Sequence, residues 1–292
     1  MIEIKHLKKY YDKTLALTID SLAIENNHVL GLVGTNGSGK STLLRLIAGV
    51  LTQEEGEIAL DGISVKDHPE CKKDLLYISD DPIDHVNTSI DSLFLFYSVF
   101  YGMTREKLNA YLDYFSIPHS GNLSKFSKGM RRRTYLAIAL AVEPKILLLD
   151  EAFDGLDPTG KKAFILALSE LIERNDMTVI VASHSIRELE NLCDSYLMLQ
   201  EGKVITYAPE GLNGEDFTKI GVAFKDSFDF TKLSSPKAIL VSHIDKIGTL
   251  FFEGTKEEAE AYLAPFAPAV TEFTPLSAEE YFILKTEEHK HD

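Results

Sequence analysis

Residues 31–42, GLVGTNGSGKST, constrain the fold of this chain more than any other segment. From Gly34 to Ser41 they match the phosphate-loop pattern G-x-x-x-x-G-K-[ST]. A short apolar run at 28–34, HVLGLVG, leads into the loop, and STLLRLIAGVL follows with apolar residues at helical spacing. This order of strand, loop and helix predicts an α/β fold that binds a nucleoside triphosphate.

Each position of the loop suits contact with phosphate. The glycines let the backbone approach phosphate oxygens, and the helix that starts near Lys40 directs its positive end to the same place. Lys40 is expected to reach the β- and γ-phosphates, and the Ser41 hydroxyl to ligate Mg²⁺. The nucleotide-binding residues predicted in the loop are Asn36, Gly37, Ser38, Gly39, Lys40, Ser41 and Thr42.

An acidic pair ends a second apolar run, KILLLDEAFDGLD at 145–157. Asp150, at the carboxyl end of the expected strand, is placed to bind Mg²⁺ directly or through water. Glu151 faces another direction, where it is expected to orient or deprotonate an attacking water. Standing alone, the pair would be interpreted as a cap of the following helix. Beside a phosphate loop it predicts a metal ligand and a catalytic base.

The remaining pattern indicates two domains. The runs DLLYIS, KILLLD and TVIVAS alternate with helical segments, which predicts a mostly parallel core sheet, and Asp61-Gly62 within GEIALDGISV predicts a hairpin. We expect a nucleotide-binding domain at 1–210, with a helical subdomain at about 85–140, and a small α+β domain at 211–292. The strands expected in the second domain are IGVAFK, AILVSH, TLFFEG and AVTEFT, and its helices are KEEAEAYLA and SAEEYFILKTEE.

Composition narrows the class of protein. The 292 residues are 45% hydrophobic and 26% charged, as in ordinary globular proteins. The formal net charge of −15 argues against a nucleic-acid partner, because binding to phosphates relies on Lys and Arg. No apolar run reaches the ~18 residues of a membrane span, and MIEIKHLKKYY is not expected to act as a secretory signal. Cys71 and Cys193 fit no metal spacing and are expected to be reduced thiols.

A second loop-to-helix unit lies between the two phosphate-site motifs. In LSKFSKGMRRRTYLAIALAVEP, Ser127-Lys128-Gly129 precede a helix expected to run to about Val142 and to stop at Pro144. One γ-phosphate does not need two such anion sites, so the second is expected to bind the nucleotide of another subunit. Most of the three arginines at 131–133 are expected on a solvated helix face.

In their order and spacing, these motifs resemble the nucleotide-binding subunits of ATP-binding cassette (ABC) transporters over about residues 1–208. GTNGSGKST is similar to Walker A, FSKGM to the signature loop, ILLLDE to Walker B and GLDP at 155–158 to the D-loop. SHSIRELE places His184 at the family's switch histidine. KKYYDKTLAL places Tyr11 where an aromatic ring stacks on adenine.

The resemblance implies a fold and an assembly. It implies the P-loop ABC ATPase fold, with an antiparallel β subdomain and a helical subdomain, and the cofactors ATP and Mg²⁺. Two subunits, identical or different, would enclose two ATP molecules, with Ser127 and Gly129 of one completing the site of the other. His184 would bond the γ-phosphate, although a histidine alone would be interpreted as a core or capping residue. The two ATP-binding subunits would be peripheral on the cytoplasmic face of the cell membrane. They would be bound to membrane-spanning permease subunits, whose transport they power.

Two residues depart from the family pattern. Lys128 replaces the usual glycine of the signature loop. The loop after the third core strand usually carries a glutamine that ligates Mg²⁺, and aligning YISDDP puts Asp80 there, with Asp81 as the alternative. These variants and the C-terminal domain resemble bacterial exporters whose ATPase and membrane parts are separate chains.

Other nucleotide-binding proteins fit less well. A P-loop GTPase would need N-K-x-D, which is absent from the sequence. Translation-factor ATPases of this type carry two cassettes, and chromosome ATPases interrupt theirs with a long coiled coil. The alternative that remains is a non-transport ABC ATPase that acts on a soluble partner as a regulatory or interaction protein. The sequence does not name a cargo.

Overall fold

The computed structural model describes residues 1–82, 88–174, 176–190, 192–208, 217–277, 279–281 and 284. The chain divides into two compact units, Met1–Pro209 and Glu210–Asp292. The predicted tail helix SAEEYFILKTEE lies largely outside the described residues. Among the described residues, no helix combines the length and the apolar character that crossing a membrane requires.

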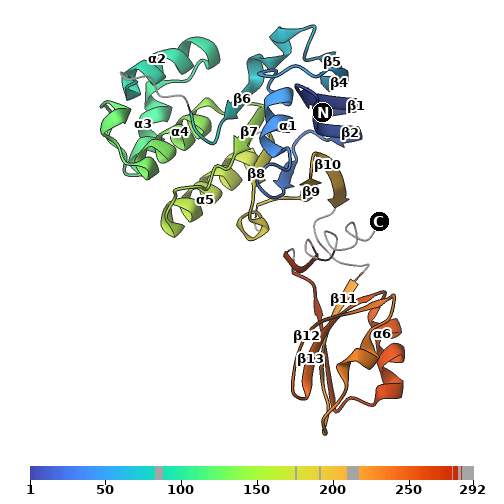
Figure 1. Cartoon of the computed structure of the whole chain (residues 1–292). Helices are drawn as coiled ribbons and strands as arrows, with labels where there is room; N and C mark the ends of the chain where they lie inside the picture. Colours follow the sequence, from blue (N-terminus) through green and yellow to red (C-terminus); the bar gives the residue numbers. More distant parts are fainter. Residues whose placement is uncertain are drawn as a thin grey trace. The chain divides into compact units, whose positions relative to one another are not determined.

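A ten-stranded sheet forms the centre of the first unit, in the order β5-β4-β1-β2-β10-β9-β3-β8-β7-β6 (Figure 1). Strands β9, β3, β8, β7 and β6 pair in parallel, which confirms the predicted mostly parallel core. Both faces of such a sheet are covered, so its central strands β3 and β8 are buried throughout. The strands are β1 Ile2–Tyr11, β2 Thr14–Ile24, β3 Val29–Val33, β4 Glu55–Leu60, β5 Ile63–Ser64, β6 Leu75–Ile78, β7 Ile146–Asp150, β8 Thr178–Ser183, β9 Ser195–Gln200 and β10 Lys203–Ala208.

The antiparallel part of this sheet contains the predicted hairpin. Leu60 on β4 pairs with Ile63 on β5, and the two residues between them, Asp61 and Gly62, have φ values of 49° and 77°. Two successive positive φ angles are what a type I′ turn requires, which explains the Asp-Gly pair.

Helices α2, α3 and α4 gather in a lobe beside β6 (Figure 1). This lobe overlaps the range of about 85–140 where a helical subdomain is expected. Its helices begin at polar caps: the hydroxyls of Ser89, Thr104 and Ser127 each accept a backbone N–H of the first turn. The helices are α1 Lys40–Ile47, α2 Ile90–Tyr101, α3 Arg105–Tyr114, α4 Lys128–Val142 and α5 Pro158–Arg174, with 3₁₀ turns at Pro69–Asp74, Leu123–Lys125 and Ile186–Glu188.

The second unit contains a four-stranded antiparallel sheet in the order β12-β13-β11-β14, with the helix Lys256–Leu263 on it. Ile220, Leu250 and Phe252 of the sheet and Ala259 and Leu263 of the helix share one buried core. All four predicted strands are present, although the first begins three residues before IGVAFK. The elements are β11 Phe217–Ala223, β12 Ala238–Ile244, β13 Ile247–Glu253, α6 Lys256–Leu263 and β14 Val270–Pro275, with 3₁₀ turns at Phe230–Leu233 and Ala264–Phe266.

Candidate active site

The phosphate loop joins the buried strand β3 to α1. Gly37 and Gly39 have φ values of 81° and 108°, a region that favours glycine. A Cβ on Gly34 would lie 2.3 Å from the carbonyl oxygen of Leu199, so glycine is required there by close packing. Lys40 is 5% exposed, and its ammonium donates to the carbonyl oxygen of Gly34 at 2.7 Å. The loop therefore holds a buried cation at the start of a helix, a geometry suited to phosphate.

Asp150 lies directly behind the loop, at the end of β7. Its carboxylate is fully buried and accepts hydrogen bonds from the Ser41 hydroxyl and the Tyr77 phenol, both at 3.0 Å. Burial raises the pKa of Asp150, and these two bonds oppose that rise. Burial also raises the pKa of Tyr77 to about 12, so the phenol stays protonated and donates. A hydroxyl and a carboxylate at this distance form an oxygen donor set that fits Mg²⁺.

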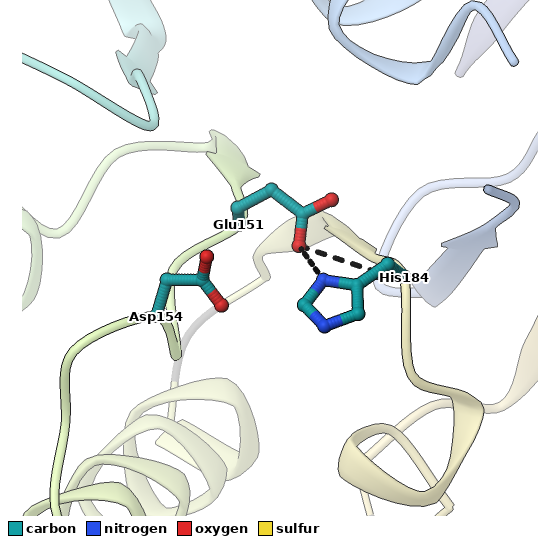
Figure 2. A group of neighbouring side chains, drawn as sticks. All are labelled: Glu151, Asp154 and His184. Carbon is teal, nitrogen blue, oxygen red and sulfur yellow. Dashed lines mark hydrogen bonds and ion pairs between the residues drawn. The ribbon is translucent and has the colours of Figure 1, made fainter. Parts of the chain in front are cut away.

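Glu151 follows Asp150 and occupies a different environment. One carboxylate oxygen lies 3.3 Å from the Lys40 ammonium, and the other accepts from the backbone N–H of His184 at 3.2 Å and from its Nδ1 at 3.0 Å. Because an ionised carboxylate only accepts, Nδ1 carries the proton in this contact. Figure 2 shows Asp154 and His184 on opposite sides of the Glu151 carboxylate. One carboxylate oxygen each from Glu151 and Asp154 and one ring nitrogen of His184 lie within 4.8 Å of one another, close enough to hold a metal ion together.

One cavity of about 670 Å³ brings most of the predicted residues together. Ser38, within the loop, is buried and does not line the cavity, and Asp150 lies behind the lining residue Ser41, from whose hydroxyl it accepts a hydrogen bond. The predicted residues that line it are Tyr11, Asn36, Gly37, Gly39, Lys40, Ser41, Thr42, Asp80, Glu151 and His184.

The site also contains residues that were not predicted, among them Tyr77, Asp154 and Glu201. Tyr77 lies in the strand DLLYIS, where an aromatic residue is usually core, so its bond to Asp150 has no signal in the sequence. Asp154 and Glu201 add two carboxylates to the cavity. Asp154 stands between the acidic pair and GLDP, so its position alone was a usable signal. The lining is rich in carboxylates, which favours a nucleotide bound together with a cation.

Tyr11 stands at the rim of this cavity. The residue is 46% exposed, which favours an accessible ring face for a purine, and its hydroxyl lies 3.4 Å from that of Thr42. Asp80 lines the cavity with a side chain that is 54% exposed, whereas Asp81 lines a neighbouring pocket instead. The geometry thus favours Asp80 over Asp81 for contact with a bound metal.

Ser127 and Gly129 do not line the cavity. Ser127 is exposed and caps α4, accepting the Met130 N–H at 3.2 Å. A Cβ on Gly155 would lie 3.5 Å from the Lys128 side chain, so this lysine packs on the GLDP segment. The two predicted anion sites are therefore separate within one chain.

The expectation that most of the arginines at 131–133 lie on a solvated face is wrong for Arg132. This residue is 5% exposed, and its guanidinium donates to the carbonyl oxygen of Ser79 at 2.8 Å. Each helical residue turns by about 100°, so three neighbours cannot share one face, and the middle one points at the ends of β6 and β7.

Comparison with known proteins agrees with these features. Residues 17–154 match the family described as ABC transporter. The ABC transporter ATP-binding protein YtrB of Bacillus subtilis is 26% identical over 286 residues, 98% of each chain. The lipopolysaccharide export system ATP-binding protein LptB of Haemophilus influenzae is 30% identical over 235 residues, 76% of this chain and 97% of LptB. The chain belongs to the ABC transporter family of ATP-binding proteins.

Solved structures of ABC proteins have the same fold as this chain. A solved structure described as the ATP-binding subunit of an ABC transporter superposes with a TM-score of 0.65 at 25% identity, covering 71% of this chain and 89% of that one. The predicted ABC ATPase fold is thereby confirmed. The chain is an ATPase of the ABC class, and its role as a transporter ATP-binding subunit stands over the soluble-partner alternative.

Proposed function

We propose that this ABC ATPase binds Mg²⁺ and ATP in the cavity around Lys40 and hydrolyses ATP to power export through separate membrane-spanning subunits. The observation that carries the proposal is the meeting of four motifs, distant in sequence, in one cavity: the phosphate loop, Glu151 of the acidic pair, His184 and Tyr11. Mg²⁺ would be held by Ser41, Asp150 and Asp80, where it neutralises phosphate charge.

Each residue has a role that its contacts support. Tyr11 stacks on the adenine, Lys40 binds the β- and γ-phosphates, and backbone N–H groups of residues 36–42 surround them. Glu151 orients and deprotonates the attacking water. His184 holds Glu151 through Nδ1, which leaves Nε2 to donate to the γ-phosphate when the ring is protonated. Lys40 leaves its contact with Glu151 when phosphates arrive, which frees that carboxylate for water.

A second ATP-binding subunit, identical or different, would complete each site. Ser127 and Gly129 lie outside their own chain's cavity, at the exposed start of a helix whose N–H groups suit an anion. In this proposal, Ser127 and Gly129 bind the γ-phosphate of the partner's ATP. The acidic chain offers no support for a nucleic-acid partner.

The membrane subunit would dock on the helical lobe. A cavity of about 480 Å³ lies between the loop after β6 and α2, with Ser79, Pro82, Phe96 and Tyr97 in its lining. Among the aromatic residues of α2, Phe96 and Phe100 are 52% and 64% exposed and pack together. Phe94, Tyr97 and Tyr101 are partly buried, and the Tyr97 ring contacts the Phe96 ring edge to face. Docking there would place the chain at the cytoplasmic face of the membrane.

Export, as opposed to import, rests on the relatives. LptB is named as part of a lipopolysaccharide export system, and the Lys128 and Asp80 departures resemble the variants of bacterial exporters.

The test is to isolate the native chain from membranes in mild detergent, identify the attached integral membrane protein, and measure ATP hydrolysis of the complex. Phe100→Ser is expected to reduce co-purification and to leave ATP affinity unchanged, because Phe100 does not line the nucleotide cavity. Leu166→Ser, which removes a 50% exposed apolar side chain elsewhere, is the control. A chain that stays in the soluble fraction and carries no membrane protein would support the soluble-partner alternative.

A further inference from the structure

Arg132 is a buried charge that the proposed reaction does not use. It lies on the second turn of α4, the helix that begins at Ser127, and it is 5% exposed. Burial lowers the pKa of its guanidinium, and the nearby carboxylates of Asp80, Asp154 and Asp150 oppose that shift. Burying a guanidinium is costly unless its donors are used, so its partners identify what it holds.

The partners of Arg132 belong to two segments beside the nucleotide cavity, one directly after β6 and one at the end of β7. One terminal nitrogen donates to the carbonyl oxygen of Ser79 at 2.8 Å. The other donates to the carbonyl oxygens of Asp150, at 3.4 Å, and Glu151, and lies 3.5 Å from the Asp80 carboxylate. One planar side chain therefore ties α4 to the segment after β6 and to the end of β7.

The Glu151 backbone is in a conformation that needs support. Its φ angle is 46°, in the left-handed region, which a residue with a side chain adopts only where its surroundings enforce it. Its N–H donates to the carbonyl oxygen of Ala182 on β8 at 3.0 Å, and its carbonyl oxygen accepts from Arg132. The peptide groups on both sides of the Glu151 Cα are thus fixed by neighbouring elements.

We propose that Arg132 is a positioning residue for hydrolysis: it holds the main chain of Glu151 so that the carboxylate points into the nucleotide cavity. The inference rests on the proposed role of Glu151 as the base. Arg132 does not line the cavity, so its loss is expected to affect the chemical step and not the binding of ATP.

The test compares Arg132→Gln and Arg132→Lys in the full chain, with Arg174→Gln as the control. Arg174 has a 72% exposed side chain, paired with Glu170, so its substitution removes the same charge elsewhere. For each variant we would measure kcat, KM, the dissociation constant of ATP, and amide hydrogen exchange by mass spectrometry. Arg132→Gln is expected to lower kcat at least about tenfold, as a misplaced catalytic group does. The ATP dissociation constant should stay within about twofold, since uniform binding is untouched.

Exchange is expected to rise in the segments 79–82 and 150–154 and to stay unchanged in 29–47. Arg132→Lys keeps the charge without the planar fork, so its kcat should lie between those of Arg132→Gln and the unsubstituted protein. If Arg132→Gln fails to fold, the lysine variant alone decides. An unchanged kcat in a folded variant would overturn the proposal. So would a fall in kcat together with weaker ATP binding and raised exchange throughout α4 and β7, because that would be a general structural role.

The Glu151→Gln background separates this inference from the proposed function. If Glu151→Gln alone keeps normal turnover, the proposed base is wrong and the premise of the inference fails with it. If Glu151→Gln abolishes turnover and Arg132→Gln does not reduce it, only the inference fails. In the double variant, Arg132→Gln should add no further loss of kcat, because two residues acting through one group are not additive.

Discussion

At the scale of single residues, the site depends on two neighbouring carboxylates with different surroundings. Asp150 is fully buried and bonded to two hydroxyls, whereas Glu151 contacts two nitrogen-bearing side chains at the cavity wall. One strand end thus supplies a carboxylate suited to a metal and another suited to a water molecule.

Glu151→Gln is expected to reduce steady-state hydrolysis by ~100-fold or more, the usual contribution of a general base. ATP binding should persist, because the amide keeps the size of the side chain and removes a negative charge from a site for phosphates. The variant should accumulate as an ATP-dependent dimer, which size-exclusion chromatography with and without ATP would detect. Glu170→Gln, with a 67% exposed side chain, is the control. Near-normal phosphate release by Glu151→Gln would show that the base lies elsewhere.

A second residue-scale prediction concerns Asp80, whose carboxylate attracts a metal and repels the γ-phosphate. Two unit charges ~6 Å apart at an effective dielectric of ~20 interact by roughly 3 kcal/mol. Since Asp80 is half exposed, salt and water should reduce this to ~1 kcal/mol, a factor of about five in an equilibrium constant. Asp80→Asn should therefore strengthen ATP binding in chelator by about fivefold, and strengthen it less, or weaken it, in Mg²⁺.

The measurement is the ratio of ATP affinities with Mg²⁺ and with chelator for Asp80→Asn and Asp81→Asn. Asp80 lines the nucleotide cavity, whereas Asp81 lines the neighbouring pocket. The affinity ratio should therefore change in Asp80→Asn and stay at the value of the unsubstituted protein in Asp81→Asn. An equal ratio in both variants and the unsubstituted protein would mean that this loop does not act as a metal ligand in the isolated subunit.

At the scale of elements, the residue that caps α4, Ser127, has two roles. Ser127 caps the helix in its own chain, and in the proposed dimer it meets the partner's γ-phosphate. Ser127→Asp keeps a cap acceptor and adds a charge that the helix N-terminus favours, so the stability of the chain should be retained. The same charge would face a phosphate across the interface, so ATP-dependent dimerisation should be lost.

Ser127→Ala is the matched variant, because it removes the cap without adding charge. It should lower the free energy of unfolding by ~1 kcal/mol. Both variants should bind ATP as monomers like the unsubstituted chain, since Ser127 does not line the cavity. Thermal unfolding and ATP-dependent size-exclusion profiles, both in the Glu151→Gln background, measure the two effects. A Ser127→Asp protein that dimerises normally would rule out a site shared in this way.

The elements also show which features a sequence can predict. The phosphate loop, the strand before Asp150 and the Asp61-Gly62 hairpin are specified by residues close in sequence, so each was predicted at its observed position. Arg132 and Tyr77 were not, because a charged helix residue or a strand tyrosine acquires its partners only when separate elements pack together. After β6, the alignment with the family pattern put Asp80 at the metal position with Asp81 as the alternative, and it is Asp80 that lines the nucleotide cavity.

At the scale of the whole molecule, the chain joins two units with separate cores. The residues that line the nucleotide cavity all belong to Met1–Pro209. The second unit has a core of its own between its sheet and α6, together with a smaller cluster that includes Phe217, Phe251 and Leu276. A unit with its own core and none of its described residues in the nucleotide cavity is expected to affect assembly more than chemistry.

A chain ending at Pro209 should therefore fold and bind ATP with a dissociation constant within about twofold of that of the full chain, because no direct contact with the nucleotide is removed. Cooperative thermal unfolding would first establish that the shortened chain is folded. Its hydrolysis per dimer should also persist, whereas co-purification with the membrane subunit or the concentration needed for ATP-dependent dimerisation should change. Loss of ATP binding in a shortened chain that unfolds cooperatively would contradict this separation, and would mean that the second unit supports the nucleotide cavity through the first.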